Sequence, residues 1–331
     1  MYDVITVGSA CIDLFVNTED KLFRRPHNHG TCIEVPFGSK ILINALHFDV
    51  GGGGTNTAVA FTRLGLKTAW IGKLGDDQHA VTILALLRKE GIDALVKKHA
   101  HRETGYSIIL DAAGHDRTIL AYKGCNDELL YAEVPQNINT KWLYFSSMLG
   151  KSKLTQENLA KFASRHNIKI MFNPSAYEAR MGYTYMQHIL KYTEILVLNQ
   201  EEAELLSRKK GIMAIIKKLK RFGPKIIIIT NGSGPAYCSD ALFLYTLYPH
   251  KIKVIESTGA GDSFGAGFLA AFIRKADIEL GLQVALANSQ SVITHHGAKK
   301  KLLTWSEALE IVRKKPARLT KVLLENCHEN V

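Results

Sequence analysis

The sequence has few cysteines and prolines, and it lacks any long apolar run. Its 331 residues include five cysteines and eight prolines, and no two cysteines form a C-x-x-C pair. A disulfide-rich scaffold is therefore excluded, and no spacing of cysteine with histidine indicates a zinc site. No apolar stretch approaches the ~20 residues of a membrane-spanning helix, and the start lacks the pattern of a signal peptide. We expect a cytoplasmic protein that has no membrane partner.

Negative charge is also scarce relative to positive charge. The chain carries 42 lysines and arginines against 31 acidic residues, a formal net charge of +11. A basic balance can indicate nucleic-acid binding. The excess is concentrated at 208–210, 217–221, 299–301 and 313–315, where few aromatic residues are interleaved. Because these clusters lie in or beside helical patterns, we interpret them as solvated faces and expect no nucleic-acid partner.

Short β-branched runs alternate with helical patterns along most of the chain. The runs lie at 4–7, 69–71, 142–145, 168–172, 195–198 and 226–229, and the helical patterns at 55–64, 78–90, 155–165, 200–207, 211–222 and 260–274. Because the runs are continuously apolar, we predict an α/β fold with a largely parallel sheet that helices cover on both faces.

Two regions depart from this alternation. Residues 14–50 hold short strand-like pieces without a convincing helix, and residues 104–123 have the pattern of a hairpin. We expect both to contribute to a small separate sheet that acts as a lid over a site, with an ordinary edge hairpin as the alternative.

The most informative segment runs from Ser257 to Phe268 and reads STGAGDSFGAGF. It follows the strand-like run Lys251–Ile255 and opens a helical pattern. Unpaired N–H groups and the positive dipole end favour an anion at such a helix start. Asp262 stands in that first turn, where a carboxylate can accept a proton from an attacking hydroxyl. Simple helix capping by the aspartate is the alternative, but it does not explain the clustered small residues.

A second glycine-rich segment runs from Gly51 to Gly65 and leads directly into a helix. Its Asn56 offers both a donor and an acceptor, which suits the hydroxyls of a sugar. The segment lacks the G-x-x-x-x-G-K-[ST] pattern of a P-loop and the G-x-G-x-x-G pattern of a dinucleotide site. A flexible turn is the alternative interpretation.

Three polar positions follow predicted strands, where ligands of α/β sheets bind. Asp13 comes after the first strand and can bind neighbouring hydroxyls, although a turn residue fits as well. Asn199 and Glu202 share one face at a helix start and can hold the waters of Mg²⁺, or form a cap. The turn from Thr230 to Pro235 can hold phosphate or ribose, or serve as a hairpin turn.

Taken in order, these segments resemble the signatures of the ribokinase-like (PfkB) carbohydrate kinases. The segment 51–65 is similar to the first signature of that family, and 257–268 to its T-G-A-G-D motif. Asn199 and Glu202 match its N-x-x-E motif. Thr104-Gly105 and Gly124-Cys125-Asn126 resemble the pieces that flank its lid. The resemblance extends from Val4 to about Trp305.

The resemblance implies one kinase domain over residues 1–331, with a three-layer α/β/α sandwich, a β-sheet lid, ATP and Mg²⁺. It places the base at Asp262 and the anion hole at the amides of Gly259, Ala260 and Gly261. It places sugar-binding groups at Asp13, Gly52 and Asn56, and nucleotide-binding groups at Asn199, Thr230, Gly232, Ser233 and Asn288. It places Mg²⁺ at Glu202 through water, and a monovalent cation such as K⁺ at Glu256, Thr258 and Gly297. It also implies a homodimer formed through the lid.

Several positions depart from the family's usual residues. Cys11 stands where ribokinases have Asn, and Gly53 where they have Lys, so the sugar acceptor can be ribose-like, fructose-like or another sugar. Glu256 replaces an Asp at the cation site, and Gly234-Pro235 replaces a basic residue and Gly in the nucleotide loop. The stretch 146–149 lacks an acid that some relatives use on the sugar.

Two other functions remain open on the sequence. The first is a nucleoside kinase of the same family, for which Phe15, Phe37 and Phe48 are candidates for an aromatic wall. The second is a sensor that binds sugar or nucleotide without catalysis, against which the intact Asp262 motif argues. ADP also remains open as the phosphoryl donor.

Overall fold

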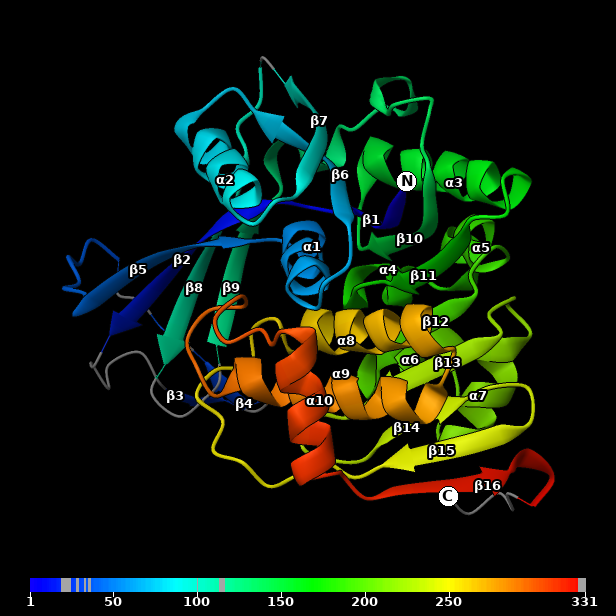
Figure 1. Cartoon of the computed structure of the whole chain (residues 1–331). Coiled ribbons are helices and arrows are strands. Elements are labelled where there is room, and N and C mark those ends of the chain that lie inside the picture. Colours follow the sequence, from blue (N-terminus) through cyan, green and yellow to red (C-terminus); the bar gives the residue numbers. More distant parts are fainter. Residues whose placement is uncertain are drawn as a thin grey trace.

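The computed structural model describes residues 1–18, 25–27, 30–32, 34, 37–99, 101–112 and 117–326. Within these residues the body is built on a ten-stranded sheet in the order β16-β15-β14-β13-β12-β11-β10-β1-β6-β7 (Figure 1). Neighbouring strands are parallel from β7 to β13 and antiparallel from β13 to β16. The strands are β1 (Tyr2–Val7), β6 (Thr68–Gly75), β7 (Asp93–His99), β10 (Thr140–Ser146), β11 (Lys169–Asn173), β12 (Ile195–Asn199), β13 (Ile226–Thr230), β14 (Ala236–Ser239), β15 (Phe243–Leu247) and β16 (Leu319–Leu323).

Helices cover both faces of this sheet and create two separate cores. Successive side chains of a strand point to opposite faces, so Trp142 and Tyr144 of β10 enter one core and Leu143 and Phe145 enter the other. The first core receives α1 (Gly53–Arg63), α2 (Gln78–Lys89), α8 (Ala260–Lys275), α9 (Ile278–Ile293) and α10 (Trp305–Lys314). The second receives α3 (Gly150–Arg165), α4 (Ala176–Met181), α5 (Tyr183–Leu190), α6 (Gln200–Ser207) and α7 (Ile212–Lys220). The predicted three-layer α/β/α sandwich is confirmed.

One predicted strand is wrong. Residues Lys251–Ile255 carry a β-branched pattern, yet they form no strand and run as a loop between β15 and α8. The amides of Ile255 and Glu256 both donate to the carbonyl of Ile293 at the end of α9, at 2.9 and 3.2 Å. Because these donors are already used, the run cannot join a sheet ladder there, and Ile252 and Val254 line a cavity instead.

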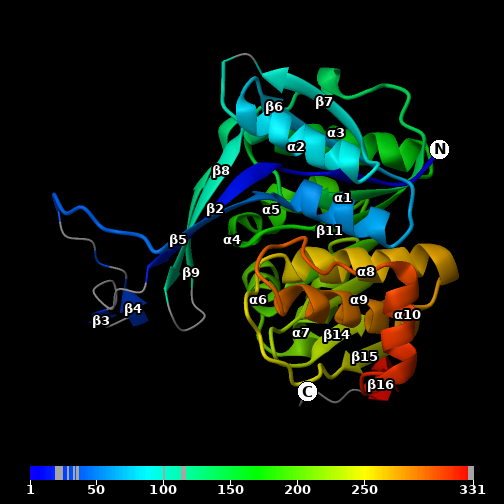
Figure 2. The ribbon, with the colours of Figure 1, turned by 60° about the vertical axis from the view of Figure 1, so that its left-hand side comes forward.

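A second sheet, the lid, stands away from the sandwich on one side (Figure 2). Its order is β5-β2-β8-β9, with β2 (Cys11–Thr18), β5 (Ala45–Gly51), β8 (Gly105–Ala112) and β9 (Arg117–Tyr122). A separate pair, β3 (Arg25–His27) and β4 (Gly30–Cys32), lies at its far end. These strands overlap the expected lid regions 14–50 and 104–123, but β2 begins earlier, at Cys11, and β5 ends at Gly51. Positions 19–24, 28–29, 33, 35–36 and 113–116 of those regions lie outside the described residues.

The motifs that flank the lid attach it to the sandwich. The Asn126 amide donates to the carbonyl of Ala10 at 2.9 Å and accepts from the amide of Ala10 at 3.0 Å. The Thr104 hydroxyl and backbone N–H both donate to Asp77, at 2.8 and 2.7 Å. These bonds fix the residues just before β2 and β8, so the lid strands leave the body at a defined place. In the described part of the chain, no helix is long and apolar enough to cross a membrane.

Candidate active site

Two helix N-termini meet at the carboxyl end of the parallel strands. Helix α1 begins just after Gly52, whose φ of 95° favours glycine and whose missing side chain leaves room for the carbonyl of Ser9, 2.5 Å from an added Cβ. Helix α8 begins after Gly259, which has a φ of 76°. The two helices pack against each other, so the glycine segments 51–54 and 257–261, far apart in the sequence, flank one site.

Asp262 and Asn56 face each other across these helices. The Asn56 amide nitrogen donates to Asp262 Oδ2 at 2.8 Å. Burial raises the pKa of Asp262 to about 6, while the Asn56 hydrogen bond and the charge of Lys299 lower it and Asp13 raises it further. A Cβ on Gly53 would lie 3.4 Å from Asp262 Oδ1, so the glycine leaves open space beside this second oxygen. The carboxyl group therefore has one oxygen fixed by the protein and one beside open space, as a base needs.

Lys299 belongs to this site, and its placement corrects the interpretation of cluster 299–301 as a solvated face. Its side chain is buried, with 5% exposure, while Lys300 and Lys301 are exposed. Its ammonium donates to the carbonyl of Val50 at 2.5 Å and to Asn56 Oδ1. Both polar atoms of Asn56, which the sequence assigned to the sugar, thus have protein partners.

The lid contributes Asp13 from β2. This carboxylate is buried, with 7% exposure, and accepts from the Cys11 thiol at 3.2 Å. Burial raises the pKa of Asp13, against the lowering effects of the Cys11 hydrogen bond, the Lys299 charge and Ser107. An added Cβ at Gly51 would come within 1.9 Å of Asp13 Oδ2, so that glycine is required where the lid carboxylate approaches α1. Asp13 lies in a lid strand, not in a turn after β1.

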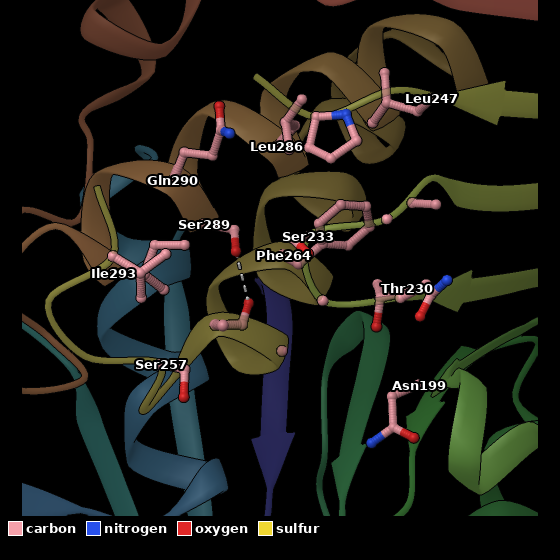
Figure 3. A pocket seen from close by; sticks show the side chains of 18 of the residues that line it. Asn199, Thr230, Ser233, Leu247, Ser257, Phe264, Leu286, Ser289, Gln290 and Ile293 are labelled. Carbon is pink, nitrogen blue, oxygen red and sulfur yellow. Dashed lines mark hydrogen bonds between the residues drawn. The ribbon is translucent and has the colours of Figure 1, made fainter. Parts of the chain in front are cut away.

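A cavity of about 750 Å³ lies on the other side of the α8 N-terminus (Figure 3). Leu247, Phe264 and Leu286 gather at one end, and Asn199 and Ser257 lie toward the other. The walls include the predicted nucleotide-binding residues Asn199, Thr230, Gly232 and Ser233. An apolar end and a polar end suit a ligand with a flat apolar part and a polar, charged part.

A smaller cavity of about 400 Å³ adjoins the first and reaches Asp262. Its walls include Ser9 after β1, Gly53 at the start of α1, Lys123, and Ser146 at the end of β10. The two cavities share Asn199, Thr230, Ser257, Ala260 and Gly261. The start of α8 therefore forms part of the wall between a large cavity and the space beside the carboxylate.

Ala260 and Gly261, two of the three residues predicted to form an anion hole, lie at this shared wall, and Gly259 lines the smaller cavity alone. The Ala260 N–H donates to the carbonyl of Ser257 at 3.3 Å, a long bond. An added Cβ at Gly261 meets nothing within 4 Å, so this residue faces open space. A Cβ at Gly259 would instead lie 2.6 Å from the Cβ of Ala298. Gly259 thus serves the turn, and Gly261 presents backbone to the cavity.

Asn199 and Glu202 form a capping box at the start of α6. Asn199 Oδ1 accepts from the Glu202 N–H at 2.8 Å, and Glu202 Oε2 accepts from the Asn199 N–H at 2.9 Å. The cap interpretation of this pair is therefore correct, and both residues also line the smaller cavity. Burial raises the pKa of Glu202. Beside it, burial raises the pKa of Glu178, on α4, to about 7.

Asn288 is not in the wall of the large cavity, in contrast to its expected nucleotide contact. It is fully buried; its amide donates to the carbonyl of Ser263 at 2.9 Å and accepts from the Leu303 N–H at 3.0 Å. The next residues on α9, Ser289 and Gln290, line the cavity instead, and Ser289 Oγ donates to the carbonyl of Ala260 at 3.1 Å (Figure 3). On α9, therefore, Ser289 and Gln290 face this cavity and Asn288 faces the interior.

The expected cation residues lie together beside α8. Glu256 Oε2 accepts from the Gly297 N–H at 3.0 Å, and His296 Nδ1 lies 3.5 Å from the same oxygen. The Thr258 hydroxyl is buried and has no hydrogen-bond partner among the described residues. Within the described ranges, no group of three or more His, Cys, Asp or Glu side chains could hold a metal ion. Any metal here would need ligands from backbone, hydroxyl, water or substrate.

Comparison with known proteins gives one consistent family. The family model described as pfkB family carbohydrate kinase matches residues 1–305. The 5-dehydro-2-deoxygluconokinase of Bacillus licheniformis is 26% identical over 334 residues, covering 94% of this chain and 96% of that protein. The ribokinase of Bacillus subtilis is 27% identical over 317 residues, covering 94% and 100%.

Solved structures agree on the fold. A nucleoside kinase of Methanocaldococcus jannaschii, described as an archaeal member of the ribokinase family, has a TM-score of 0.79 at 24% identity and covers 95% of this chain and 99% of that one. A candidate ribokinase II from E. coli, solved with ATP and Mg²⁺, has a TM-score of 0.81 at 18% identity and covers 95% and 100%. The names of these relatives differ in the acceptor.

Proposed function

Because this chain belongs to the pfkB family of carbohydrate kinases, phosphotransferases that act on a sugar hydroxyl, we propose that it transfers the γ-phosphoryl group of ATP to a small ribose- or fructose-like sugar. One observation carries the proposal. Asp262, a carboxylate of raised pKa, stands in the first turn of α8 and lines the smaller cavity, next to Ala260 and Gly261, which line both cavities.

The large cavity is the proposed nucleotide site. The adenine packs against Leu247, Phe264 and Leu286, and the triphosphate extends toward Ser257 and Gly261. The positive dipole end of α8 stabilises the γ-phosphoryl group and the charge that develops on it. The bound E. coli structure supports ATP as the donor.

The acceptor lies between Asp262 and the lid residue Asp13. Its hydroxyl oxygen forms a bond to the γ-phosphorus while the bond from that phosphorus to the bridging oxygen of ATP breaks, and ADP leaves. The hydroxyl proton passes to Asp262 Oδ1, and Asn56 holds Oδ2 meanwhile. Positioning and charge stabilisation supply most of the rate enhancement in such transfers. Asp13 binds other hydroxyls of the sugar.

Glu202 and Asn199 are the residues that would hold Mg²⁺ through water. The arrangement fits, because burial raises the pKa of Glu202 and a nearby cation would favour its charged form. Mg²⁺ keeps several waters and binds few protein groups directly. When bound, it neutralises charge on the phosphate oxygens. A monovalent cation at Glu256, Thr258 and Gly297 is a further part of the proposal, supported by the unpartnered Thr258 hydroxyl.

A nucleoside acceptor is the second candidate, favoured by one observation on the lid. Asp13 and Phe15 point to the same lid face because side chains alternate along a strand. Phe48 pairs with Leu14 on the other face and is 54% exposed, and Phe37 is fully exposed. Phe15 alone of the three is placed to stack on a nucleoside base beside Asp13.

The outer lid face supports the proposed homodimer. Leu14 lies beside Phe48 on one side and Ile108 on the other, and Ile108 lies beside Leu120. Phe48 and Leu120 are each 54% exposed. An exposed apolar sheet face of this kind is typical of a protein–protein contact, and a second copy of the lid would cover it.

A panel of free sugars, sugar acids, sugar phosphates and nucleosides tests the proposed function. ADP release from ATP is measured with each compound and with Asp262→Asn as the blank. We expect a neutral sugar to stimulate ADP release well above the blank. Stimulation by nucleosides alone would select the second candidate, and binding without ADP release would indicate a sensor.

A further inference from the structure

The buried ammonium of Lys299 is not explained by the roles assigned so far. Lys299 follows α9, in a loop whose next two residues, Lys300 and Lys301, are exposed. Its own side chain is 5% exposed and reaches the carbonyl of Val50 and the amide oxygen of Asn56. A buried charge is costly and is retained only where it is compensated.

The contact with Asn56 has a consequence for Asp262. An ammonium can only donate hydrogen bonds, so the atom of Asn56 that faces Lys299 must be the oxygen. The other end of the amide, the NH₂ group, then faces Asp262 and donates to its Oδ2 at 2.8 Å. The three side chains form a chain of donors and acceptors that has one direction, from Lys299 through Asn56 to Asp262.

Lys299 also acts on Asp262 through its charge, which lowers the pKa of that carboxyl group. Four groups from the described residues face it: Asn56 from α1, Lys299 from the loop after α9, Asp13 from β2 and the Tyr144 hydroxyl from β10. Lys299 is the sole cation of this set, and Asp13 works against it. Lys299 itself also faces Asp49 and Cys11. Burial lowers the pKa of Lys299, and the charges of Asp49 and Asp13 oppose that effect.

We propose that Lys299 is a positioning residue for phosphoryl transfer, which orients the Asn56 amide so that Asp262 remains a hydrogen-bond acceptor and hence a base. The inference rests on the proposed function and adds a residue to its machinery. Without Lys299 the amide can turn by about 180°, because the two ends of an amide have nearly the same shape. Its oxygen would then face Asp262. A carboxyl group beside an amide oxygen must carry a proton to form a hydrogen bond, and a protonated Asp262 cannot accept the proton of the sugar.

The test compares Lys299→Met with Lys300→Met, which removes an exposed lysine next in sequence. The pKa of the Asp262 side chain is read from ¹³C NMR of carboxyl-labelled protein, with Asp262→Asn to assign the signal. We expect Lys299→Met to raise this pKa by about one pH unit or more, and Lys300→Met to leave it unchanged. The acid limb of kcat should move to higher pH by the same amount. An unchanged Asp262 pKa in folded Lys299→Met would overturn the proposal.

The same substitution in an Asn56→Leu background separates orientation from simple charge. If Lys299 acts through the amide, its removal raises the pKa of Asp262 less in Asn56→Leu than in the native protein. Equal shifts in both backgrounds would show that the charge acts through space, and this mechanism would be wrong. Should Lys299→Met fail to fold, Lys299→Leu is measured in its place, since it also removes both the charge and the hydrogen-bond donor. The NMR measurement needs no turnover, so it stands if the proposed acceptor is wrong.

Discussion

Replacing Asp262 with asparagine removes the proposed base with little change of shape. In the native protein the Asn56 amide donates to Asp262 Oδ2 at 2.8 Å. The side-chain oxygen that Asp262→Asn retains can still accept this hydrogen bond. The substitution therefore keeps the contact between α1 and α8 and removes only the proton acceptor.

General-base assistance contributes ~10²–10⁴-fold to an enzymatic rate. We expect kcat of Asp262→Asn to fall by this factor, which corresponds to about 3–5 kcal/mol of transition-state stabilisation. The KM for ATP should change little, because the large cavity is lined by other residues. In the native protein, kcat/KM should fall below a pH of about 6, where the carboxylate becomes protonated.

The same substitution should also change how the stability of the folded protein depends on pH. The pKa of Asp262 rises from 3.8 to about 6 on folding, so the folded protein binds this proton more tightly than the unfolded chain does. Stability is therefore lost as the pH rises through this range, by about 3 kcal/mol. Asp262→Asn avoids this loss, so it should be more stable than the native protein at a pH of about 7.5 and equally stable near a pH of about 3.

Urea denaturation at both pH values, together with steady-state kinetics, measures the two effects. Near-normal kcat in purified, folded Asp262→Asn would refute the assignment of the base. A substitution that lowers stability at the higher pH would refute the burial argument for the raised pKa.

Five other changes have distinct expected outcomes. Glu202→Gln keeps the backbone cap but loses the charge, so the Mg²⁺ concentration for half-maximal activity should rise, and an unchanged titration would leave the pair a cap alone. Asp13→Asn should raise the KM for the acceptor about tenfold or more with little effect on the KM for ATP; the reverse pattern would exchange the two ends of the site. Gly261→Ala has open space for its methyl group, so it should fold normally and weaken ATP use, whereas Gly259→Ala at a φ of 76° should cost about 1–3 kcal/mol of stability by chemical denaturation. Phe48→Glu should convert a dimer into a monomer in light scattering without loss of folding, and an unchanged mass would remove the lid from the interface.

Local sequence pattern was sufficient to predict those parts of the fold and the site whose structure depends on a single segment of the chain. Continuous apolar runs such as Ile226–Ile229 predicted buried parallel strands because both of their faces meet helices. Glycines before a helical pattern predicted that Asn56 and Asp262 lie near helix starts, and both residues do lie in the first turns of α1 and α8.

The pattern failed where a residue's environment comes from distant segments. Nothing local distinguishes Lys299 from Lys300 and Lys301, because burial of the first depends on α1 and β5. The run Lys251–Ile255 has strand-forming residues, but its neighbouring backbone donors are taken by α9. On that helix the choice between Asn288 and its neighbour Ser289 depends on a rotation of about 100° that sequence periodicity did not fix.

The most direct test of the central claim is the fate of the γ-phosphoryl group. ATP labelled at the γ-phosphate is incubated with the native protein, Mg²⁺ and the acceptor panel, and the products are separated and identified by mass spectrometry. We predict a labelled phosphate monoester of a sugar, formed in equal amount to ADP and absent with Asp262→Asn. Label that appears only as inorganic phosphate, or remains in ATP with every acceptor, would contradict the account.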